Sequence, residues 1–379
     1  MPHNPLSDEV YLRRTKPAKP DIRAEYFRDQ TKIIHSYPFR RLKHKTQVFF
    51  APDNDHICTR IEHVLHVATI AATVCRGLNH SGKDWALDTE LAYAIGLGHD
   101  LGHAPFGHEG EKELAAKLGE AKAFMHEVNS YRVVEHLANR GQGLNLTYAV
   151  KDGIICHCGE DFSSNCLHPS SQPNDLEKIR DHHTMPCTYE GCIVRLADRI
   201  AYLGRDVEDG VAAGFITKAD LPRRVVQELG DSNTDIIDAL VSDLVSNSAQ
   251  VDGIGFSAEK HALMTELGKF NYERIYYHPT LVKFRRHIHT VVHTLFDYFQ
   301  DLYSKNGTDF KSYAAMDLEV DRNFGHYVQQ LRAVYEREGW PAKTIVTDYI
   351  AGMTDGFALD NMRQISLPSP MHFPRGGRP

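Results

Sequence analysis

An adjacent histidine and aspartate are the first residues in this sequence whose types suggest chemistry. His99 and Asp100 lie in the segment AIGLGHDLGHAPFGHEG, after an apolar run from Leu91 to Leu97. Neighbouring side chains on a regular helix point about 100° apart and rarely share a ligand, but at a helix end both can turn towards one ion. An imidazole and a carboxylate together suit Mn, Fe, Mg or Zn. Taken alone, the pair is more often a simple hydrogen bond at a helix terminus.

Two further segments strengthen the case for a metal site. Arg60 and His63 lie three positions apart on an expected helix and therefore share one face. Asp198 lies within an apolar segment, residues 193–200, of another expected helix. A carboxylate in such surroundings is costly unless it is paired or bound to a metal. The pattern is thus a histidine, a His-Asp pair and a distant aspartate, in that order.

This order resembles the HD superfamily of metal-dependent phosphohydrolases and, more narrowly, the deoxyguanosine triphosphate triphosphohydrolase (dGTPase) family. The matching segments are FRRLKHKTQVF (39–49), TRIEHVLHV (59–67), GHDLGHAPFGHEGE (98–111), RLADRIAYLGRDVED (195–209) and DYIAGMTD (348–355). They span almost the whole chain in the order of the family. Carried over residue by residue, the resemblance implies a divalent metal (Mn, Mg, Fe, Co or Zn) held by His63, His99, Asp100 and Asp198.

A second pair of residues could transfer protons. His108 and Glu111 are spaced by three at the start of an expected helix, so that the carboxylate can orient the imidazole and tune its pKa. On spacing alone, a surface histidine beside a solvated glutamate is equally plausible. The resemblance implies that the two are the catalytic pair, and it places His103 and His126 in the active site, facing the substrate phosphates. Which of His108 and His126 acts on the leaving group stays open, so His126 is also a catalytic candidate.

A triphosphate substrate would need cationic groups besides the metal. Arg60 lies one turn from His63, and Arg199 is adjacent to Asp198. Both arginines therefore fit a role in phosphate binding. The alternatives are that Arg60 pairs with Glu62 and that Arg199 is an ordinary surface residue.

Asp198, Tyr202 and Asp206 follow one another at spacings of four and form a polar stripe on one helix. The resemblance implies that Tyr202 packs near the sugar of a bound nucleotide and that Asp206 bonds its 3′-hydroxyl. Gln47 matches a family residue that also meets the sugar. A tyrosine against C2′ would leave no room for a 2′-hydroxyl and would favour deoxyribose. Without the resemblance, Tyr202 would be read as a core aromatic.

The overall composition narrows the class of protein. The chain has 379 residues, of which 42% are hydrophobic, and a formal net charge of -7. Mild acidity argues against bulk nucleic-acid binding, and no apolar run of about 18 residues predicts a membrane span. The polar N-terminus lacks a signal-peptide core, and seven cysteines do not suit a secreted disulfide scaffold of this length. A cytoplasmic protein with no membrane partner is expected.

Apolar periodicity predicts a mainly α fold, an HD-domain helical architecture with little β structure. Helices are expected over Ile61–Val74, Glu90–Leu97, Asn233–Val245 and Phe324–Tyr335, and a further helix is expected to start at Arg195. Asp88 and Thr89 are candidate caps of the second of these helices. Thr46–Phe50 is a candidate strand.

The expected domain organisation has three parts: an N-terminal extension (1–30), an HD phosphohydrolase core (31–300) and a C-terminal helical region packed on the core (301–379). Within the core, Asp161–Pro173 is rich in Ser, Asn and Pro and should form a loop. The tail Pro368–Pro379 should be loosely ordered.

A cluster of cysteines and histidines has no counterpart among the family motifs. Its members are Cys156, His157, Cys158, Cys166, His168, His182, His183, Cys187 and Cys192. Four of them could form a structural zinc site, but the spacing lacks paired C-x-x-C elements. The alternative is a set of scattered reduced thiols, with His157 explained by the histidine that the family often carries there.

The resemblance implies hydrolysis of deoxynucleoside triphosphates (dGTP or several dNTPs) to deoxynucleoside and inorganic triphosphate. It also implies a homo-oligomer, often a hexamer in the family, with dNTPs or single-stranded DNA as effectors. Two alternatives remain: an HD phosphodiesterase or 5′-nucleotidase, and a non-catalytic nucleotide-sensing protein. The sequence specifies neither the preferred base nor the native metal.

Overall fold

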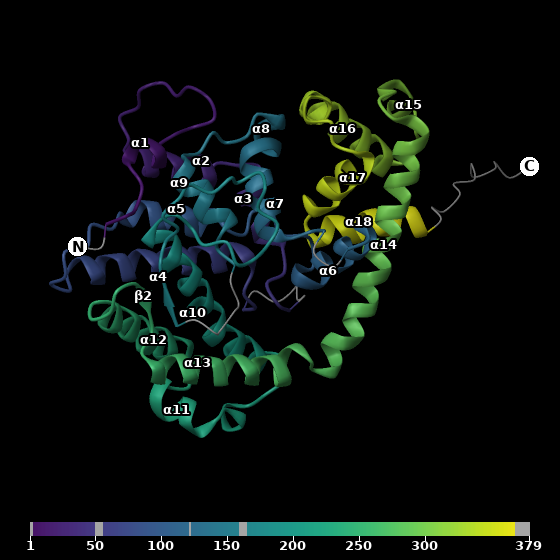
Figure 1. The fold of residues 1–379 in the computed structure, drawn as a ribbon. Helices are drawn as coiled ribbons and strands as arrows, with labels where there is room; N and C mark the ends of the chain where they lie inside the picture. Colours follow the sequence, from purple (N-terminus) through teal and green to yellow (C-terminus); the bar gives the residue numbers. More distant parts are fainter. Residues whose placement is uncertain (1–2, 50–55, 121–122, 159–164, 368–379) are drawn as a thin grey trace, which may run out of the picture.

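The protein is mainly α-helical, which confirms the prediction from the sequence (Figure 1). A computed structural model describes residues 3–49, 56–120, 123–158 and 165–367. Within these ranges, the only strands are β1 (Cys166–Leu167) and β2 (Ile254–Gly255), which pair antiparallel with Cys166 opposite Gly255. None of the helices in the described ranges has the length and apolar character needed to cross a bilayer.

The helices follow one another along the chain in two groups. The first half of the chain contains α1 (Asp8–Tyr11), α2 (Glu25–Ile34), α3 (Tyr37–Arg41), η1 (Leu42–His44), α4 (Arg60–Asn79), α5 (Thr89–Gly98), α6 (Gly107–Leu118), α7 (His126–Arg132), η2 (Val133–Leu137), α8 (Ala138–Gly141) and α9 (Tyr148–Ile155). The second half contains α10 (Tyr189–Ala212), η3 (Lys218–Asp220), α11 (Arg223–Leu229), α12 (Asn233–Ser248), α13 (Ala258–Asn271), η4 (Tyr272–Tyr276), α14 (Pro279–Asn306), α15 (Phe310–Ala314), α16 (Glu319–Glu338), α17 (Ala342–Ala351) and α18 (Asp355–Ser366).

The predicted helices are present as α4, α5, α12 and α16, each somewhat longer than its apolar pattern indicated. At the start of α5, the side chain of Asp88 accepts the backbone N–H groups of Glu90 and Leu91, as expected of a cap. One predicted start is wrong: α10 begins at Tyr189, capped by Thr188, so that Arg195 lies inside the helix.

The strand predicted over Thr46–Phe50 is also wrong. Thr46 forms only an isolated bridge with Thr59, residues 47–49 are not in a strand, and residue 50 is outside the described ranges. The backbone N–H of Thr46 donates instead to the side chain of Asp355 at 2.8 Å, which takes it away from any sheet.

The loop predicted over Asp161–Pro173 contains β1, because two of its residues pair with β2. Residues 161–164 of this segment and the predicted tail 368–379 lie outside the described residues. The division of the chain at residues 30 and 300 stays a prediction.

Two hydrophobic cores organise the helices. The first is built mainly by α2, α4, α5, α9, α10, α12 and α13. The second is built by α14, α16, α17 and α18 together with apolar residues of α6. Figure 1 shows the long helix α14 running from the end of α13 to α15, with α16–α18 gathered beside its C-terminal part. The helix α6 packs against α14, and α16 contacts η2 and α8, whose apolar residues belong to the first core.

The helices α4 and α5 pack closely against each other in the first core. A Cβ atom on Gly96 of α5 would lie 2.6 Å from the Cα of Ala68 on α4, so only glycine permits this approach. The contact lies within one or two turns of His63 on α4 and of His99 after α5. Tight backbone packing therefore brings the two histidines to the same end of the helix pair.

Candidate active site and metal centre

Three helices bring together the four residues expected to bind the metal. His63 comes from the first turn of α4, His99 and Asp100 follow the end of α5, and Asp198 comes from the middle of α10. The Nε2 atom of His63 lies 2.9 Å from Oδ1 of Asp198. The Nε2 atom of His99 lies 3.5 Å from Oδ1 of Asp100 and 3.8 Å from Oδ1 of Asp198. The potential ligand atoms of His63, His99 and Asp100 thus form one group within 4.8 Å of one another, and those of His99 and Asp198 form a second group with His157.

His99 has the hydrogen bonding expected of a metal ligand. Its Nδ1 lies 2.7 Å from the carbonyl oxygen of Gly96, and because a carbonyl only accepts, Nδ1 carries the proton. The buried Nε2 then presents a lone pair, and it has no hydrogen-bond partner among the described residues. A ligating histidine ordinarily donates its other N–H in this way. The residues present therefore fit a divalent cation.

Electrostatics keep the two carboxylates of this cluster ionised. Burial opposes the charge on Asp100, but His99, His103 and Arg60 together hold its pKa well below the usual value. Burial likewise opposes the charge on Asp198, and the hydrogen bond from His63 lowers its pKa below the usual value. Both side chains are therefore available as anionic oxygen ligands near neutral pH.

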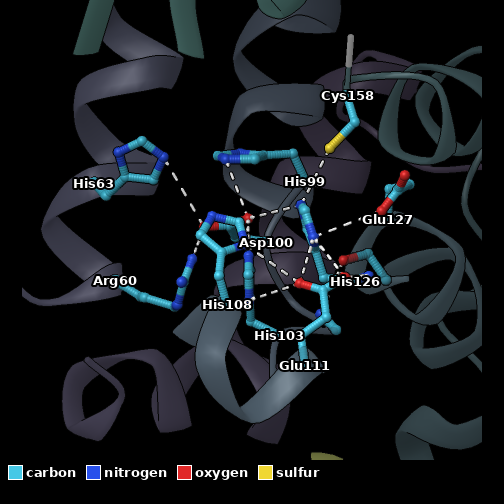
Figure 2. A network of polar contacts seen from close by, with 12 residues as sticks. Arg60, His63, His99, Asp100, His103, His108, Glu111, His126, Glu127 and Cys158 are labelled. Atoms are coloured by element: carbon cyan, nitrogen blue, oxygen red, sulfur yellow. Dashed lines mark hydrogen bonds and ion pairs between the residues drawn. The ribbon is translucent and has the colours of Figure 1, made fainter. Parts of the chain in front are cut away.

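Glu111 lies between two of the candidate catalytic histidines. Its Oε2 atom is 3.3 Å from Nδ1 of His108 and 3.1 Å from Nδ1 of His126. Oε1 accepts the backbone N–H of His126 at 2.8 Å, so the carboxylate also fixes the start of α7. Burial opposes ionisation of Glu111, but the two histidines lower its pKa well below the usual value. Figure 2 shows this pair of histidines around one carboxylate.

The two histidines differ in exposure. The side chain of His108 is 55% exposed, whereas that of His126 is buried. Burial lowers the pKa of His126, but Cys158, Glu111 and Glu127 raise it well above the usual value. His126 is therefore expected to hold its proton, while His108 can exchange protons with solvent.

His103 completes the histidine group by stacking on His126. The ring centroids are 3.9 Å apart and the planes differ by 17°. Burial, Arg60 and His126 hold the pKa of His103 well below the usual value, so it is neutral. The preceding residue, Gly102, packs against α7 so closely that a Cβ would lie 2.1 Å from the backbone nitrogen of Ser130. This contact fixes the loop that carries Asp100 and His103.

A cleft of about 450 Å³ opens over the cluster. Its lining includes every predicted site residue except His99, Glu111 and Asp206. Arg60 donates to Oδ2 of Asp100 at 2.5 Å, which leaves its buried Nε and Nη2 without hydrogen-bond partners among the described residues. The buried Oε1 of Gln47 also has no partner within those ranges. Unsatisfied buried donors of a cation next to a cleft are suited to an anionic ligand.

The polar stripe along α10 divides into two environments. Asp198, Arg199 and Tyr202 line the cleft, but Asp206 does not. The carboxylate of Asp206 is buried and accepts the hydroxyl proton of Tyr276, from η4. Burial raises the pKa of Asp206 to about 7. The structure therefore places Asp206 beside Tyr276, away from the lining of the cleft.

Three residues of the cleft were missed as site residues: Arg195, His157 and Cys158. Arg195 precedes Asp198 by three positions, and this spacing could have identified it. Its guanidinium donates to the carbonyl oxygens of Cys156 (3.0 Å) and Thr184 (2.8 Å). It therefore connects the end of α9 to the segment that precedes α10.

The cysteines of the predicted cluster occupy different surroundings. Cys166 donates to the carbonyl oxygen of Asp252, and Cys187 lies against Asp152. Cys158 instead lines the cleft, with Sγ 3.2 Å from Nε2 of His126. All seven cysteines are free thiols.

Comparison with known proteins agrees with this geometry. Residues 60–203 match the model of the HD domain, and residues 254–364 match that of a phosphohydrolase-associated domain. The chain is 38% identical to a deoxyguanosinetriphosphate triphosphohydrolase-like protein of Desulfatibacillum aliphaticivorans, over 94% of this chain and 92% of the relative. A protein of the same description from Caldanaerobacter subterraneus subsp. tengcongensis is 37% identical over 97% and 93%. One from Clostridium tetani is 33% identical over 97% and 93%.

Proposed function

Because the chain belongs to the deoxyguanosinetriphosphate triphosphohydrolase-like family of HD-domain proteins, we propose that it hydrolyses deoxynucleoside triphosphates. The products are a deoxynucleoside and inorganic triphosphate. The observation that carries the proposal is the cleft itself. In it the His-Asp cluster lies beside several histidines and beside Arg60, whose buried Nε and Nη2 lack hydrogen-bond partners among the described residues.

His63, His99, Asp100 and Asp198 would hold the metal. A divalent cation at this position supplies Lewis acidity towards the α-phosphate and favours ionisation of water. The set of two imidazoles and two carboxylates suits Mn, Fe, Mg, Co or Zn, without selecting one of them.

Three groups of the chain serve the phosphates. Arg60 keeps one N–H on Asp100 and directs the others at the substrate, so a phosphate would satisfy donors that are otherwise buried and unpaired. His126, held protonated by Glu111 and its neighbours, adds a second positive charge. Arg199 lines the same cleft and adds a third.

His108 is the proposed general acid. Cleavage of the bond between the α-phosphorus and the 5′-oxygen requires a proton on the leaving oxygen. His108 reaches the cleft, is bonded to Glu111 and exchanges protons with solvent. The buried His103 is neutral and stacked, which supports a hydrogen-bonding role towards a phosphate oxygen.

Tyr202 and Gln47 are the proposed sugar contacts. Both line the cleft, and Tyr202 lies one turn beyond Asp198 on α10. A ribose laid along α10 from the metal cluster would meet the tyrosine ring at C2′, which favours deoxyribose. Asp206 would bond the 3′-hydroxyl only if that hydroxyl replaced the hydroxyl of Tyr276.

The decisive experiment is product analysis in water enriched in oxygen-18. The four dNTPs, singly and mixed, are supplied with Mn, Mg or Co. We expect equal amounts of deoxynucleoside and triphosphate, with the label in the triphosphate, because water attacks the α-phosphorus. Release of orthophosphate from monophosphates would instead indicate a nucleotidase or phosphodiesterase, and nucleotide binding without turnover under all conditions would indicate a sensor. Sizing with and without dNTPs or single-stranded DNA tests the expected homo-oligomer and its effectors.

A further inference from the structure

A second group of metal-ligating atoms lies in the same cleft. Nε2 of His126 is 3.3 Å from Nε2 of His157, and Sγ of Cys158 lies 3.2 Å from the first and 3.4 Å from the second. Figure 2 shows Cys158 in the same group of side chains as His126. The three atoms form a nearly equilateral triangle. Both histidines are buried, and Cys158 is half-buried.

Both imidazoles are oriented as metal ligands. Nδ1 of His157 lies 2.7 Å from the carbonyl oxygen of Ile154, so it carries the proton and Nε2 presents a lone pair. This repeats the arrangement of His99, whose Nδ1 is also 2.7 Å from the carbonyl three residues before it. Nδ1 of His126 faces the carboxylate of Glu111. Donation of the second ring N–H to a carbonyl or carboxylate is the usual support of a ligating histidine.

The spacing of the triangle matches tetrahedral zinc. Bonds of about 2.0–2.1 Å to nitrogen and about 2.3 Å to sulfur place tetrahedral ligand atoms about 3.3–3.6 Å apart. The three observed separations lie within about 0.1 Å of that range. A proton on Nε2 of His126 can point at only one of the other two acceptors, whereas a cation contacts all three.

The ligand atoms of His126, His157 and Cys158 are softer donors than those of the cluster formed by His63, His99, Asp100 and Asp198. One thiolate and two imidazoles favour Zn²⁺ or Co²⁺ over Mg²⁺ or Mn²⁺, while the two carboxylates of the first cluster also accept the harder ions. We propose that His126, His157 and Cys158 form a second site, for a zinc-like cation, whose occupation inhibits the enzyme. On binding, the S–H bond of Cys158 and the Nε2–H bond of His126 break and both protons leave to solvent. Sulfur and both Nε2 atoms then bond to the cation without change of oxidation state.

Inhibition is expected because His126 would serve both as a ligand of the second cation and as a contact of the substrate phosphates. A cation on Nε2 of His126 removes the N–H that this residue directs into the cleft, and it leaves a metal-bound ring where a phosphate contact is proposed. This regulatory part rests on the proposed function, but the binding part does not.

The test is cobalt absorption of the manganese-loaded protein. Added Co²⁺ should produce thiolate-to-cobalt charge transfer in the wild type and in Cys166→Ser, a half-buried thiol outside the cleft, but not in Cys158→Ser. Zn²⁺ should inhibit dNTP hydrolysis by the wild type and by Cys166→Ser, and Cys158→Ser should need about 10–100-fold more Zn²⁺. In the unmodified wild type, Zn²⁺ should also slow alkylation of Cys158, measured by peptide mass spectrometry.

The outcomes are separable. Equal charge-transfer bands in the wild type and Cys158→Ser, or alkylation of Cys158 unaffected by Zn²⁺, would overturn the site. A band that depends on Cys158 in a protein that Zn²⁺ does not inhibit would overturn the regulatory part. The same band in a protein that hydrolyses no dNTP would support the site while contradicting the proposed function.

Discussion

Asp355 accepts a hydrogen bond of 2.8 Å from the backbone N–H of Phe106, although 249 positions separate the two residues. Its second oxygen accepts the N–H of Thr46 at 2.8 Å. Phe106 has a left-handed backbone (φ 65°) and lies two residues before His108, and Thr46 lies directly before Gln47. One buried carboxylate at the start of α18 thus holds two segments that carry site residues.

Replacing Asp355 with Ala should therefore lower both stability and activity. Two N–H groups would lose their acceptor, at about 1–3 kcal/mol each where they stay buried. We expect a lower free energy of unfolding in denaturant titrations and a lower kcat/KM. Asp360→Ala is the control, because Asp360 lies on the same helix with a side chain that is 63% exposed. Equal effects of the two substitutions would show that the contact with Phe106 does not support the site.

Replacing Asp198 with Ala should abolish metal binding and activity while the chain stays folded. The side chain is the carboxylate closest to His63, and the helix around it is held by apolar contacts. Metal content by elemental analysis and helicity by circular dichroism are the measurements. Glu208→Gln, on the exposed side of α10, should keep its metal. A metal-replete Asp198→Ala protein with normal turnover would remove this residue from the ligand set.

His108→Ala should leave the metal content near normal and lower kcat by about 10²–10⁴, the usual worth of general acid–base catalysis. Glu111→Gln should lower kcat as well, because this carboxylate contacts both His108 and His126. Glu109→Gln is the matched control on α6, since Glu109 pairs with Lys112 and Arg285 instead. Wild-type kcat in His108→Ala would assign the proton transfer to another group, and His126→Ala would be measured next.

Tyr202→Ala should narrow the preference for deoxyribonucleotides by raising kcat/KM for GTP relative to dGTP. The ring lines the cleft one turn from Asp198, where it would exclude a 2′-hydroxyl. Asp206→Ala should weaken use of dGTP by about 1–3 kcal/mol if the 3′-hydroxyl bonds this carboxylate. It should leave 2′,3′-dideoxy-GTP unaffected. Unchanged ratios among the three nucleotides in both variants would mean that this stripe does not face the sugar.

Asp206 should also make stability depend on pH. Burial raises its pKa from 3.8 to about 7, against the hydrogen bond from Tyr276, so the folded state prefers the neutral acid. The stabilising contribution of the neutral Asp206 carboxyl is therefore fully present below the pKa that Asp206 has in the unfolded chain. This contribution is lost as the pH rises through the pKa of Asp206 in the folded protein. Between about pH 4 and about pH 8, Asp206→Asn should gain stability relative to the wild type, by at most about 4 kcal/mol. If the free energy of unfolding changed with pH in the same way in Asp206→Asn and the wild type, ionisation of Asp206 would not destabilise the folded protein. Asp238→Asn, at an exposed position of α12, is the control.

The sequence by itself determined the features that depend on nearby residues. The period of apolar residues predicted α4, α5, α12 and α16, since one buried face is enough to stabilise each helix. The motifs that resemble the family also singled out most of the residues that line the cleft. Residue type limits which atoms can bind a cation or a phosphate, and residue types are known from the sequence alone.

Only the tertiary structure decided the contacts between distant segments. No local pattern shows that Thr46 donates to Asp355, and this contact replaces the predicted strand. No spacing shows that Asp206 meets Tyr276 or that Cys158 meets His126. Such pairs depend on the relative orientation and register in which helices far apart in the chain pack against one another. Close packing fixes that register collectively, so no single segment contains it.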